Sequence, residues 1–508
     1  MKRPIVFHTI LFGIFPVIFL YSNNLHILVL DDIVLPLLLV IGATILLWFT
    51  LKKVLKSKEK SGLLISLYLL LFFTFGHIWI LINGFEIGGF EIGRLRFLFI
   101  LYIILFLIGS YYLYKTKRKL DNVTTITNYM AIALLIIAFV NIGTYHLENY
   151  QYSDVEITSG KIPFDVSQVT TFPNVYYIIL DAYANSHTLK EDFDYDNQEF
   201  ITFLTDSGFN VADKSYSNYP VSLLSIPSTM NMKYLNYLSE RYDDSKDRHE
   251  LYRLLDRNLV MQYFKTMGYQ IINFDGGNLM GDIKIADKNL CEIQFWHNQV
   301  WLLLQHTTIL NAFPILQSAG SIREYKICVF SELPALEINN EKPIFVFAHI
   351  AMPHSPYLFG ENGEPKNPKT LFFELQTEDP DKKGYLEQLK FTNKKIQEVI
   401  DKILKESKTS PIIIIQSDHG PRMGVDWKTA YNDEKLVKRI FSNFDAYYFP
   451  GEKKPSLIEP RTPVNTFRIV FNHYFNGTFD MLENAVYYTN AADKLFQFRD
   501  VTDILIEK

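Results

Sequence analysis

Long apolar runs dominate the first 147 residues of the chain. Five of them approach the ~20 residues that a helix needs to cross a bilayer. They are IVFHTILFGIFPVIFLY, DIVLPLLLVIGATILLWFTL, GLLISLYLLLFFTFGHIWILI, RFLFILYIILFLIGSYYLY and NYMAIALLIIAFVNIGTY. The pattern predicts an N-terminal α-helical transmembrane bundle of about five spans.

The loops between these runs differ in charge. KKVLKSKEK and YKTKRKLDN are strongly basic, whereas NNLHILVLDD and NGFEIGGFEIGR are nearly neutral or acidic. Basic loops stay in the cytoplasm, so these loops and the N-terminus are predicted to lie inside. With an odd number of spans, everything after about Glu148 is then expected outside the membrane. The start Met-Lys-Arg resembles a signal peptide, but no cleavage motif follows, and an uncleaved helix is expected.

The pattern changes after the last apolar run, where strand-like runs alternate with helical stretches. The predicted strands are NVYYIIL, YQIINF, PIFVFAHI, PIIIIQS and DAYYF, and the predicted helices cover about 222–234, 249–267, 385–405 and 463–475. Such alternation is typical of an α/β domain whose mostly parallel central sheet is covered by helices on both faces. We therefore expect a transmembrane anchor over 1–147, a linker over 148–172 and an exported domain over 173–508.

Composition narrows the function classes. The net charge of −5 is too mild to indicate nucleic acid as a partner. The apolar runs carry almost no ionisable side chains, so an anchor is favoured over a transporter. Cys291 and Cys328 both fall in the exported part, where they could form a disulfide or remain two buried thiols.

Residues that suit a metal site follow three of the predicted strands. Asp181 ends NVYYIIL, Asp418 and His419 end PIIIIQS, and His354 follows PIFVFAHI. Parallel strands end at one rim of a sheet, so these side chains are expected to converge there. Two carboxylates and an imidazole predict a site for a divalent cation.

A nucleophile is suggested by SYSNYPVSLLSIPSTM, in which Pro220 ends an extended segment and a helical period follows. Ser222 would then lie near a helix N-terminus, which favours a developing alkoxide. The alternative is a helix-capping serine without chemistry. Three further residues have ordinary explanations: Arg422 as a surface arginine, His349 as a buried hydrogen-bonded residue and Asp275 as a turn aspartate.

The segments ILDAYA, SLLSIP, PHSPY and SDHG together resemble the alkaline phosphatase and sulfatase superfamily. The closer similarity is to its membrane-anchored bacterial branch, the phosphoethanolamine transferases and lipoteichoic acid synthases. The resemblance implies an alkaline-phosphatase-like domain in which Asp181, Ser222, Asp418 and His419 hold one divalent metal ion. Zinc or manganese is expected there, with magnesium or calcium as alternatives. It also implies Ser222 as the nucleophile and His354 close to the substrate's phosphate.

The chain departs from this family pattern in three places. Asp181 stands where the transferases commonly use glutamate. The segment PRMGVDWKTAYNDE, which follows SDHG, contains no histidine, so a second metal site is not expected. In SIPST, which begins at Ser225, Thr229 stands where sulfatases have arginine. Ordinary sulfate-ester hydrolysis is therefore disfavoured, and Ser225 is the alternative nucleophile.

The function that the resemblance implies is a metal-dependent phosphotransferase. It would move a phosphoethanolamine or phosphoglycerol headgroup from a membrane lipid donor onto an envelope glycan or lipid, through a covalent intermediate on Ser222. The expected location is the bacterial cytoplasmic membrane, multi-pass, with the catalytic domain on the extracytoplasmic side. One alternative is a sulfatase-like hydrolase, a phosphodiesterase or sulfatase, that uses water as acceptor. Another is a non-catalytic envelope assembly protein on a degenerate phosphatase fold.

Overall fold

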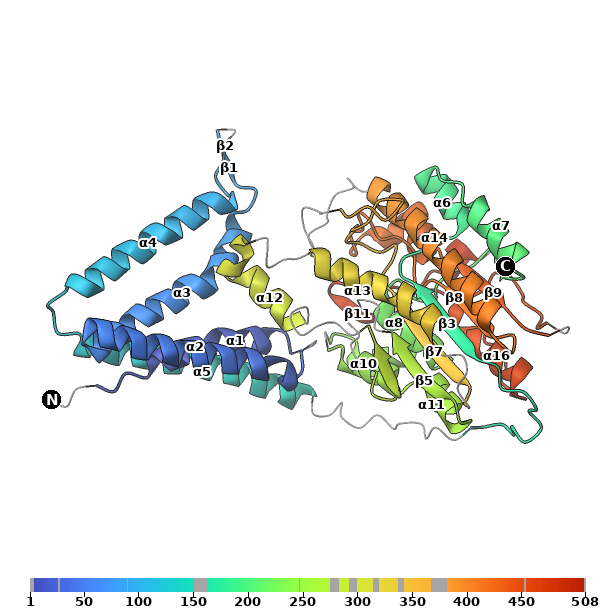
Figure 1. Cartoon of the computed structure of the whole chain (residues 1–508), viewed down its shortest axis with the longest axis horizontal. Coiled ribbons are helices and arrows are strands. Elements are labelled where there is room, and N and C mark those ends of the chain that lie inside the picture. The colour runs from blue at the N-terminus through green and yellow to red at the C-terminus, as the bar shows by residue number, and fades with distance from the viewer. Residues whose placement is uncertain are drawn as a thin grey trace. The chain divides into compact units, whose positions relative to one another are not determined.

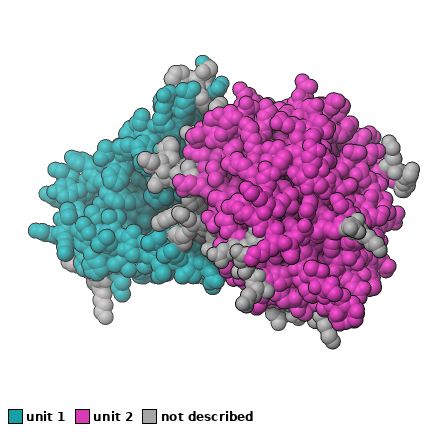
Figure 2. Space-filling model, turned by 45° about the vertical axis from the view of Figure 1, so that its right-hand side comes forward, with its two compact units in different colours: residues 1–155, 294–318 teal, residues 156–293, 319–508 magenta. Residues whose placement is uncertain are grey.

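The structure is a computed structural model of the whole chain. It describes residues 4–25, 28–88, 90–149, 162–245, 247–274, 283–291, 299–313, 319–336, 342–366, 382–451 and 454–506. The chain forms two compact units (Figure 2). Each unit consists of two segments of the chain. The first contains residues 1–155 and 294–318, and the second contains residues 156–293 and 319–508.

The first unit contains the helices expected from the apolar runs. They are α1 (His8–Asn23), α2 (Leu30–Leu55), α3 (Lys58–Ile82), α4 (Leu95–Lys115) and α5 (Asp121–Asn149), with a hairpin of β1 (Glu86–Ile87) and β2 (Phe90–Glu91) between α3 and α4. Helices α2 to α5 are long and apolar enough to cross a membrane, whereas α1 is apolar but has only 16 residues. The prediction of an N-terminal membrane bundle is confirmed, and the protein is membrane-anchored.

The second unit is built on a seven-stranded sheet of order β4-β9-β8-β3-β7-β5-β6. Its strands are β3 (Val175–Leu180), β4 (Asn210–Val211), β5 (Gln270–Phe274), β6 (Lys288–Leu290), β7 (Ile344–Ile350), β8 (Ile412–Gln416) and β9 (Asp445–Tyr448). The strands from β8 to β6 run parallel, and only β9 is antiparallel to its neighbours. The predicted mostly parallel sheet is confirmed.

Both faces of the sheet are covered by helices (Figure 1). Alternate residues of β3 point to opposite faces: Tyr176 and Ile178 join one core cluster, and Tyr177 and Ile179 join the other. The first cluster includes side chains of α6 (Ser186–Phe193), α7 (Gln198–Asp206), α13 (Ala319–Glu332) and α14 (Lys382–Glu406). The second includes side chains of α8 (Ser222–Met230), α10 (His249–Asp256), α11 (Leu259–Thr266) and α16 (Thr466–Tyr474).

Some elements differ from the expected ones. The predicted helix over 249–267 is broken into α10 and α11, because the Asn258 side chain accepts a hydrogen bond from the Met261 N–H and starts a new helix. The sequence pattern did not predict helices α6, α7 and α13 or strands β4 and β6. It also missed a hairpin and several short helices. They are β10 (Tyr487–Asn490), β11 (Lys494–Asp500), η2 (Asn236–Leu238), α9 (Ser239–Tyr242), α12 (Gln299–Thr307), η4 (Ile309–Ala312), η6 (Leu333–Ala335), η8 (Ala430–Asn432), α15 (Glu434–Phe441), η9 (Pro463–Asn465) and α17 (Thr502–Leu505).

The two cysteines form a disulfide. Cys291 follows β6 and Cys328 lies in α13, so the bond joins a strand end to a helix of the second unit. Part of the predicted linker, residues 150–161, lies outside the described residues, and so does Asp275. The predicted domain limits remain a prediction.

Candidate functional site

Two acids and two histidines meet at the carboxyl ends of β3, β7 and β8. His349 pairs with Ile179 in the sheet register, which places it beside Asp181. The His349 Nε2 atom lies 3.7 Å from an Asp181 oxygen and 3.6 Å from an Asp418 oxygen. The His419 Nε2 atom lies 3.5 Å and 3.6 Å from oxygens of the same two acids. The expected convergence of Asp181, Asp418 and His419 is present, and His349 joins them.

Local backbone geometry fixes this rim. After β3 the chain turns at Ala182, whose φ of 62° is uncommon for a residue with a side chain. The Ala182 N–H then donates to Asp418 Oδ1, which also accepts from the His419 N–H at 3.0 Å. Gly420 completes the turn, since a Cβ there would meet the Arg439 carbonyl oxygen and lie 2.8 Å from that of Ser442. The glycine of SDHG is therefore required by close backbone packing.

The donor set fits a divalent cation. Asp181 Oδ1 and Asp418 Oδ2 are buried, and neither has a hydrogen-bond partner among the described residues. Ligand atoms of Asp181, His349 and Asp418 all lie within 4.8 Å of one another. Burial and the neighbouring Asp418 raise the pKa of Asp181, against the opposing effects of His419, His349 and Arg422. Two buried carboxylates with unpartnered oxygens next to imidazoles are the ligands that a divalent metal would satisfy.

The protonation of His419 suits a ligand. Its Nδ1–H donates to the Gly420 carbonyl at 2.8 Å. The Nε2 atom is then unprotonated, and its lone pair faces the two acids. Burial lowers the pKa of His419 to about 4 against the opposing effect of Asp418, so the ring is neutral at neutral pH. For Asp418, burial opposes ionisation, but His419, His349 and Ser222 outweigh it and hold its pKa below the usual range.

Ser222 is the first residue of α8, and Val221 occupies the capping position. The capping-serine alternative is therefore wrong. The Ser222 hydroxyl is partly buried and lies 3.3 Å from His419 Nε2. By contrast, Ser225 is 2% exposed and its hydroxyl is buried without a hydrogen-bond partner among the described residues. Of the two serines considered, Ser222 is the one that reaches the rim.

His354 and Arg422 form a pair beside the rim. Arg422 Nη2 donates to His354 Nε2 at 3.0 Å, and His354 Nδ1–H donates to the Ser355 carbonyl at 2.7 Å. Burial and the adjacent Arg422 lower the pKa of His354 to about 3, so the imidazole is neutral. Arg422 was expected as an ordinary surface residue, but it is only partly exposed and supplies a permanent positive charge next to the acids.

Lys326 is a buried residue that the sequence pattern did not single out. It is 2% exposed, and its ammonium donates to the carbonyls of Ala351, His354 and Pro356 at 2.6, 3.2 and 3.4 Å. Three carbonyls match the three N–H bonds of an ammonium group. Gln388 adds a further donor to the His354 carbonyl at 2.8 Å. Lys326 therefore fixes the loop that carries His354.

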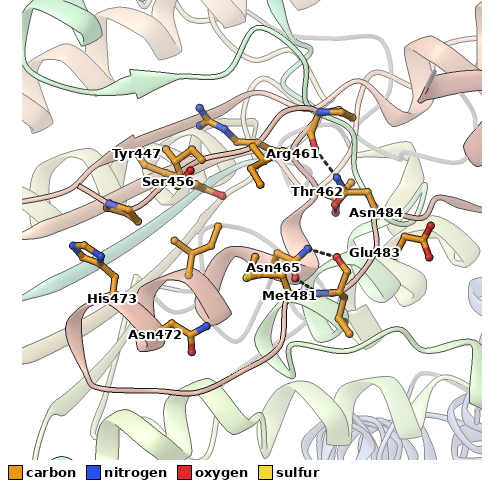
Figure 3. Close-up of a pocket in the computed structure, with 16 residues that line it drawn as sticks. Tyr447, Ser456, Arg461, Thr462, Asn465, Asn472, His473, Met481, Glu483 and Asn484 are labelled. Carbon is orange, nitrogen blue, oxygen red and sulfur yellow. Dashed lines mark hydrogen bonds between the residues drawn. The ribbon is translucent and has the colours of Figure 1, made fainter. Parts of the chain in front are cut away.

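A cavity of about 450 Å³ lies elsewhere in the second unit, beside α16 (Figure 3). Tyr447, Arg461 and His473 are among its lining residues. The Arg461 side chain is already engaged, because its guanidinium donates to the Asn210 carbonyl at 3.4 Å and pairs with Asp445 at 3.7 Å. None of the rim residues lines this cavity, so it is separate from the candidate site.

Several solved structures are similar to this chain at low identity. The C-terminal periplasmic domain of EcEptC from Escherichia coli has 12% identity and a TM-score of 0.45, over 67% of this chain and 95% of that one. The integral membrane protein lipooligosaccharide phosphoethanolamine transferase A (EptA) from Neisseria meningitidis has 12% identity and a TM-score of 0.39, over 87% of this chain and 88% of that one. No curated protein sequence matches this one.

A family model gives the clearer result. The Sulfatase model matches residues 173–473, which is more than half of the chain. The match begins just before β3, ends within α16, and contains every rim residue described above. It agrees with the sheet topology and with the superfamily that the sequence motifs resemble. The chain belongs to the sulfatase family of enzymes, and its N-terminal helices attach it to a membrane.

Proposed function

We propose that the protein is a metal-dependent phosphotransferase that takes a phospholipid headgroup from a membrane lipid donor and passes it to an envelope glycan or lipid. The observation that carries this proposal is the position of Ser222, whose hydroxyl lies 3.3 Å from His419 Nε2 at the rim of the two buried acids. The proposed location is the bacterial cytoplasmic membrane, with the second unit outside.

Asp181, Asp418 and His419 would hold the metal, with Ser222 sharing it, and the geometry adds His349 as a further candidate ligand. A divalent cation supplies a Lewis acid, which favours the ionised form of a neighbouring hydroxyl and attracts phosphoryl oxygens. Zinc or manganese suits a site of mixed oxygen and nitrogen donors.

In the first step, the Ser222 oxygen bonds to the donor's phosphorus and the bond from phosphorus to the diacylglycerol oxygen breaks. The departing oxygen gains a proton, and the headgroup phosphate remains on Ser222. An acceptor hydroxyl then loses its proton and bonds to phosphorus, the bond from phosphorus to the Ser222 oxygen breaks, and the Ser222 oxygen takes up a proton. Arg422, held by His354 Nε2 at 3.0 Å, is positioned to bind the phosphoryl oxygens throughout.

The His354 proton lies on Nδ1 and points to the Ser355 carbonyl. In this state His354 orients Arg422 and does not offer a proton to a leaving group. We therefore assign His354 charge stabilisation through Arg422 in place of acid catalysis.

The alternative acceptor is water, which would make the protein a phosphodiesterase. Two sequence features support this alternative: Asp181 stands in place of glutamate, and the segment PRMGVDWKTAYNDE after SDHG contains no histidine. Sulfate-ester hydrolysis through Ser225 is disfavoured, because that hydroxyl is buried and Thr229 stands at the position where the sulfatase motif has arginine.

The time course of diacylglycerol release distinguishes a transferase from a hydrolase. In nanodiscs that contain labelled phosphatidylethanolamine or phosphatidylglycerol and no other acceptor, a transferase should release about one diacylglycerol per active site and then stall. A hydrolase should continue at a constant rate after this burst. Sustained turnover with water alone, in protein that contains metal, would remove the transferase proposal.

Replacement of Lys326 by methionine should lower kcat by about tenfold or more, because the His354 loop loses three hydrogen bonds and Arg422 loses its orientation. Metal content should stay as in the wild type, since Lys326 contacts none of the proposed ligands. The measurement is kcat on a soluble phosphodiester, together with metal analysis. Unchanged kcat in a folded Lys326→Met protein would show that the loop does not depend on this residue.

A further inference from the structure

One segment of the chain departs from the second unit and returns to it. Residues 294–318 belong to the first unit, although residues 156–293 and 319–508 on either side belong to the second (Figure 2). The described part contains α12 (Gln299–Thr307) and η4 (Ile309–Ala312) and ends at Phe313. We call Gln299–Phe313 the docking segment. It is too short to cross a bilayer.

The docking segment is packed tightly into the first unit. Val300 and Leu304 are 0% and 5% exposed, in a cluster with side chains of α1, α2, α3 and α5. Ile309 and Ala312 pack against a second cluster formed by α3 and α4. Figure 1 shows α12 beside α3. The segment therefore contacts α2, α3 and α4, and it shares a core cluster with side chains of α1 and α5.

Gly76 of α3 makes this packing possible. A Cβ at this position would meet the His306 carbonyl oxygen and lie 2.6 Å from Thr307 Cα. These are backbone atoms of the docking segment, which cannot move aside as a flexible side chain could. Just beyond Gly76 on α3, the Trp79 ring lies 5.9 Å from the His306 ring in an edge-to-face arrangement.

The contacts fall on one end of the membrane helices. The basic loop between α2 and α3 is expected inside, so Ile82 at the end of α3 is at the outer end. Gly76 is six residues before Ile82, which places it roughly 9 Å below that end at 1.5 Å per residue. This depth corresponds to the boundary between headgroups and acyl chains, where interfacial helices lie. Phe313, 43% exposed, adds an apolar side chain suited to the same boundary.

We propose that the docking segment is a second, non-covalent membrane attachment of the catalytic unit, in addition to the chain that joins the two units near residue 155. The proposal rests on the topology stated under Proposed function. It gives the docking segment a role in lipid access, because a second attachment keeps the rim close to the headgroups of the donor.

The test uses the full chain with a protease site inserted after Val155, in membrane vesicles. After cleavage, the fragment that carries residues 156–508 should stay with the wild-type membranes. Gly76→Leu should raise the soluble fraction of this fragment about tenfold or more, because the docking segment can no longer approach α3. Gly42→Leu is the matched control, since Gly42 is also a glycine of a membrane helix and a Cβ there meets nothing within 4 Å.

A second variant guards against misfolding of α3. Leu304→Asp places a charge in the same contact from the side of the docking segment, and it should release the fragment to a similar extent. Release of the wild-type fragment, or retention of both variant fragments, would overturn the proposal. The cleaved fragment of the Ser222→Ala protein should stay with the membranes like the wild-type fragment. The test of the docking segment therefore does not depend on the proposed chemistry.

Discussion

Replacement of Ser222 by alanine should lower the rate of diacylglycerol release by about 10³-fold or more, because the nucleophile of the first step is lost. The hydroxyl is only partly buried and interacts with His419 and Asp418 at the rim, so its removal should leave the fold unchanged. The measurement is single-turnover release of diacylglycerol from nanodiscs, with metal content determined on the same samples. Weakened metal binding should be compensated by excess metal, whereas a lost nucleophile should not.

Ser225→Ala is the matched control. Ser225 lies about one helical turn after Ser222 in α8. Its hydroxyl is buried and has no hydrogen-bond partner among the described residues. Removal of a buried unpartnered hydroxyl is close to neutral for stability, so this variant should keep wild-type activity. If Ser225→Ala loses most of its activity and Ser222→Ala remains active, Ser225 is the nucleophile and Ser222 is not.

Asp418→Asn should reduce bound metal from about one ion per chain to near zero, and activity should fall with it. The Asp418 Oδ2 atom lies 3.6 Å from the Nε2 atoms of both histidines, and it is one of the two unpartnered buried oxygens. A ligand at 100 times its Kd stabilises a native protein by about 2.7 kcal/mol, so the wild-type Tm should rise when metal is added. The Tm of Asp418→Asn should not respond to metal.

Asp445→Asn is the control for Asp418→Asn. It shows whether the loss of any buried acid lowers the metal content, or only the loss of a metal ligand. Asp445 starts β9 in the same sheet and is buried, and burial raises its pKa to about 6. It pairs with Arg461 away from the rim, so its replacement should lower stability while the metal content is kept. If Asp418→Asn retains its metal, Asp418 is not a ligand.

The sheet was predictable because its central strands are apolar on both faces. The run PIIIIQS became β8, and NVYYIIL became β3, each within one or two residues. The helix break at Asn258 was less visible, because Asn258 lies inside an otherwise continuous helical period and acts only through its side-chain cap. The hairpin of β10 and β11 was missed because its alternation is short.

The rim was predictable where polar residues follow a strand directly, as with Asp181, Asp418 and His419. His349 was assigned to packing because it lies within the apolar run of β7, and only the register with β3 shows that it reaches the acids. Arg422 and Lys326 act on the loop of His354 from distant parts of the chain. No local pattern marks such contacts. The nearest signal was a lysine in the otherwise unremarkable helix α13.

The position of the docking segment also depends on contacts between distant parts of the chain, which no local sequence pattern marks. The run WLLLQHTTILNAF is apolar but much shorter than the ~20 residues of a membrane span, so nothing in it predicts a place among the membrane helices. Its place in the first unit depends on the fit between Gly76 and the backbone of residues 306–307. That fit is a property of two segments more than 200 residues apart, and neither segment indicates it alone.

The most direct test of the proposed chemistry is the mass of the intact protein after brief exposure to phosphatidylethanolamine or phosphatidylglycerol without acceptor. The wild type should gain the mass of one headgroup phosphate, on the peptide that contains Ser222, and the Ser222→Ala protein should gain none. Diacylglycerol release by the wild type without this added mass, or an added mass on a peptide that lacks Ser222, would contradict the account.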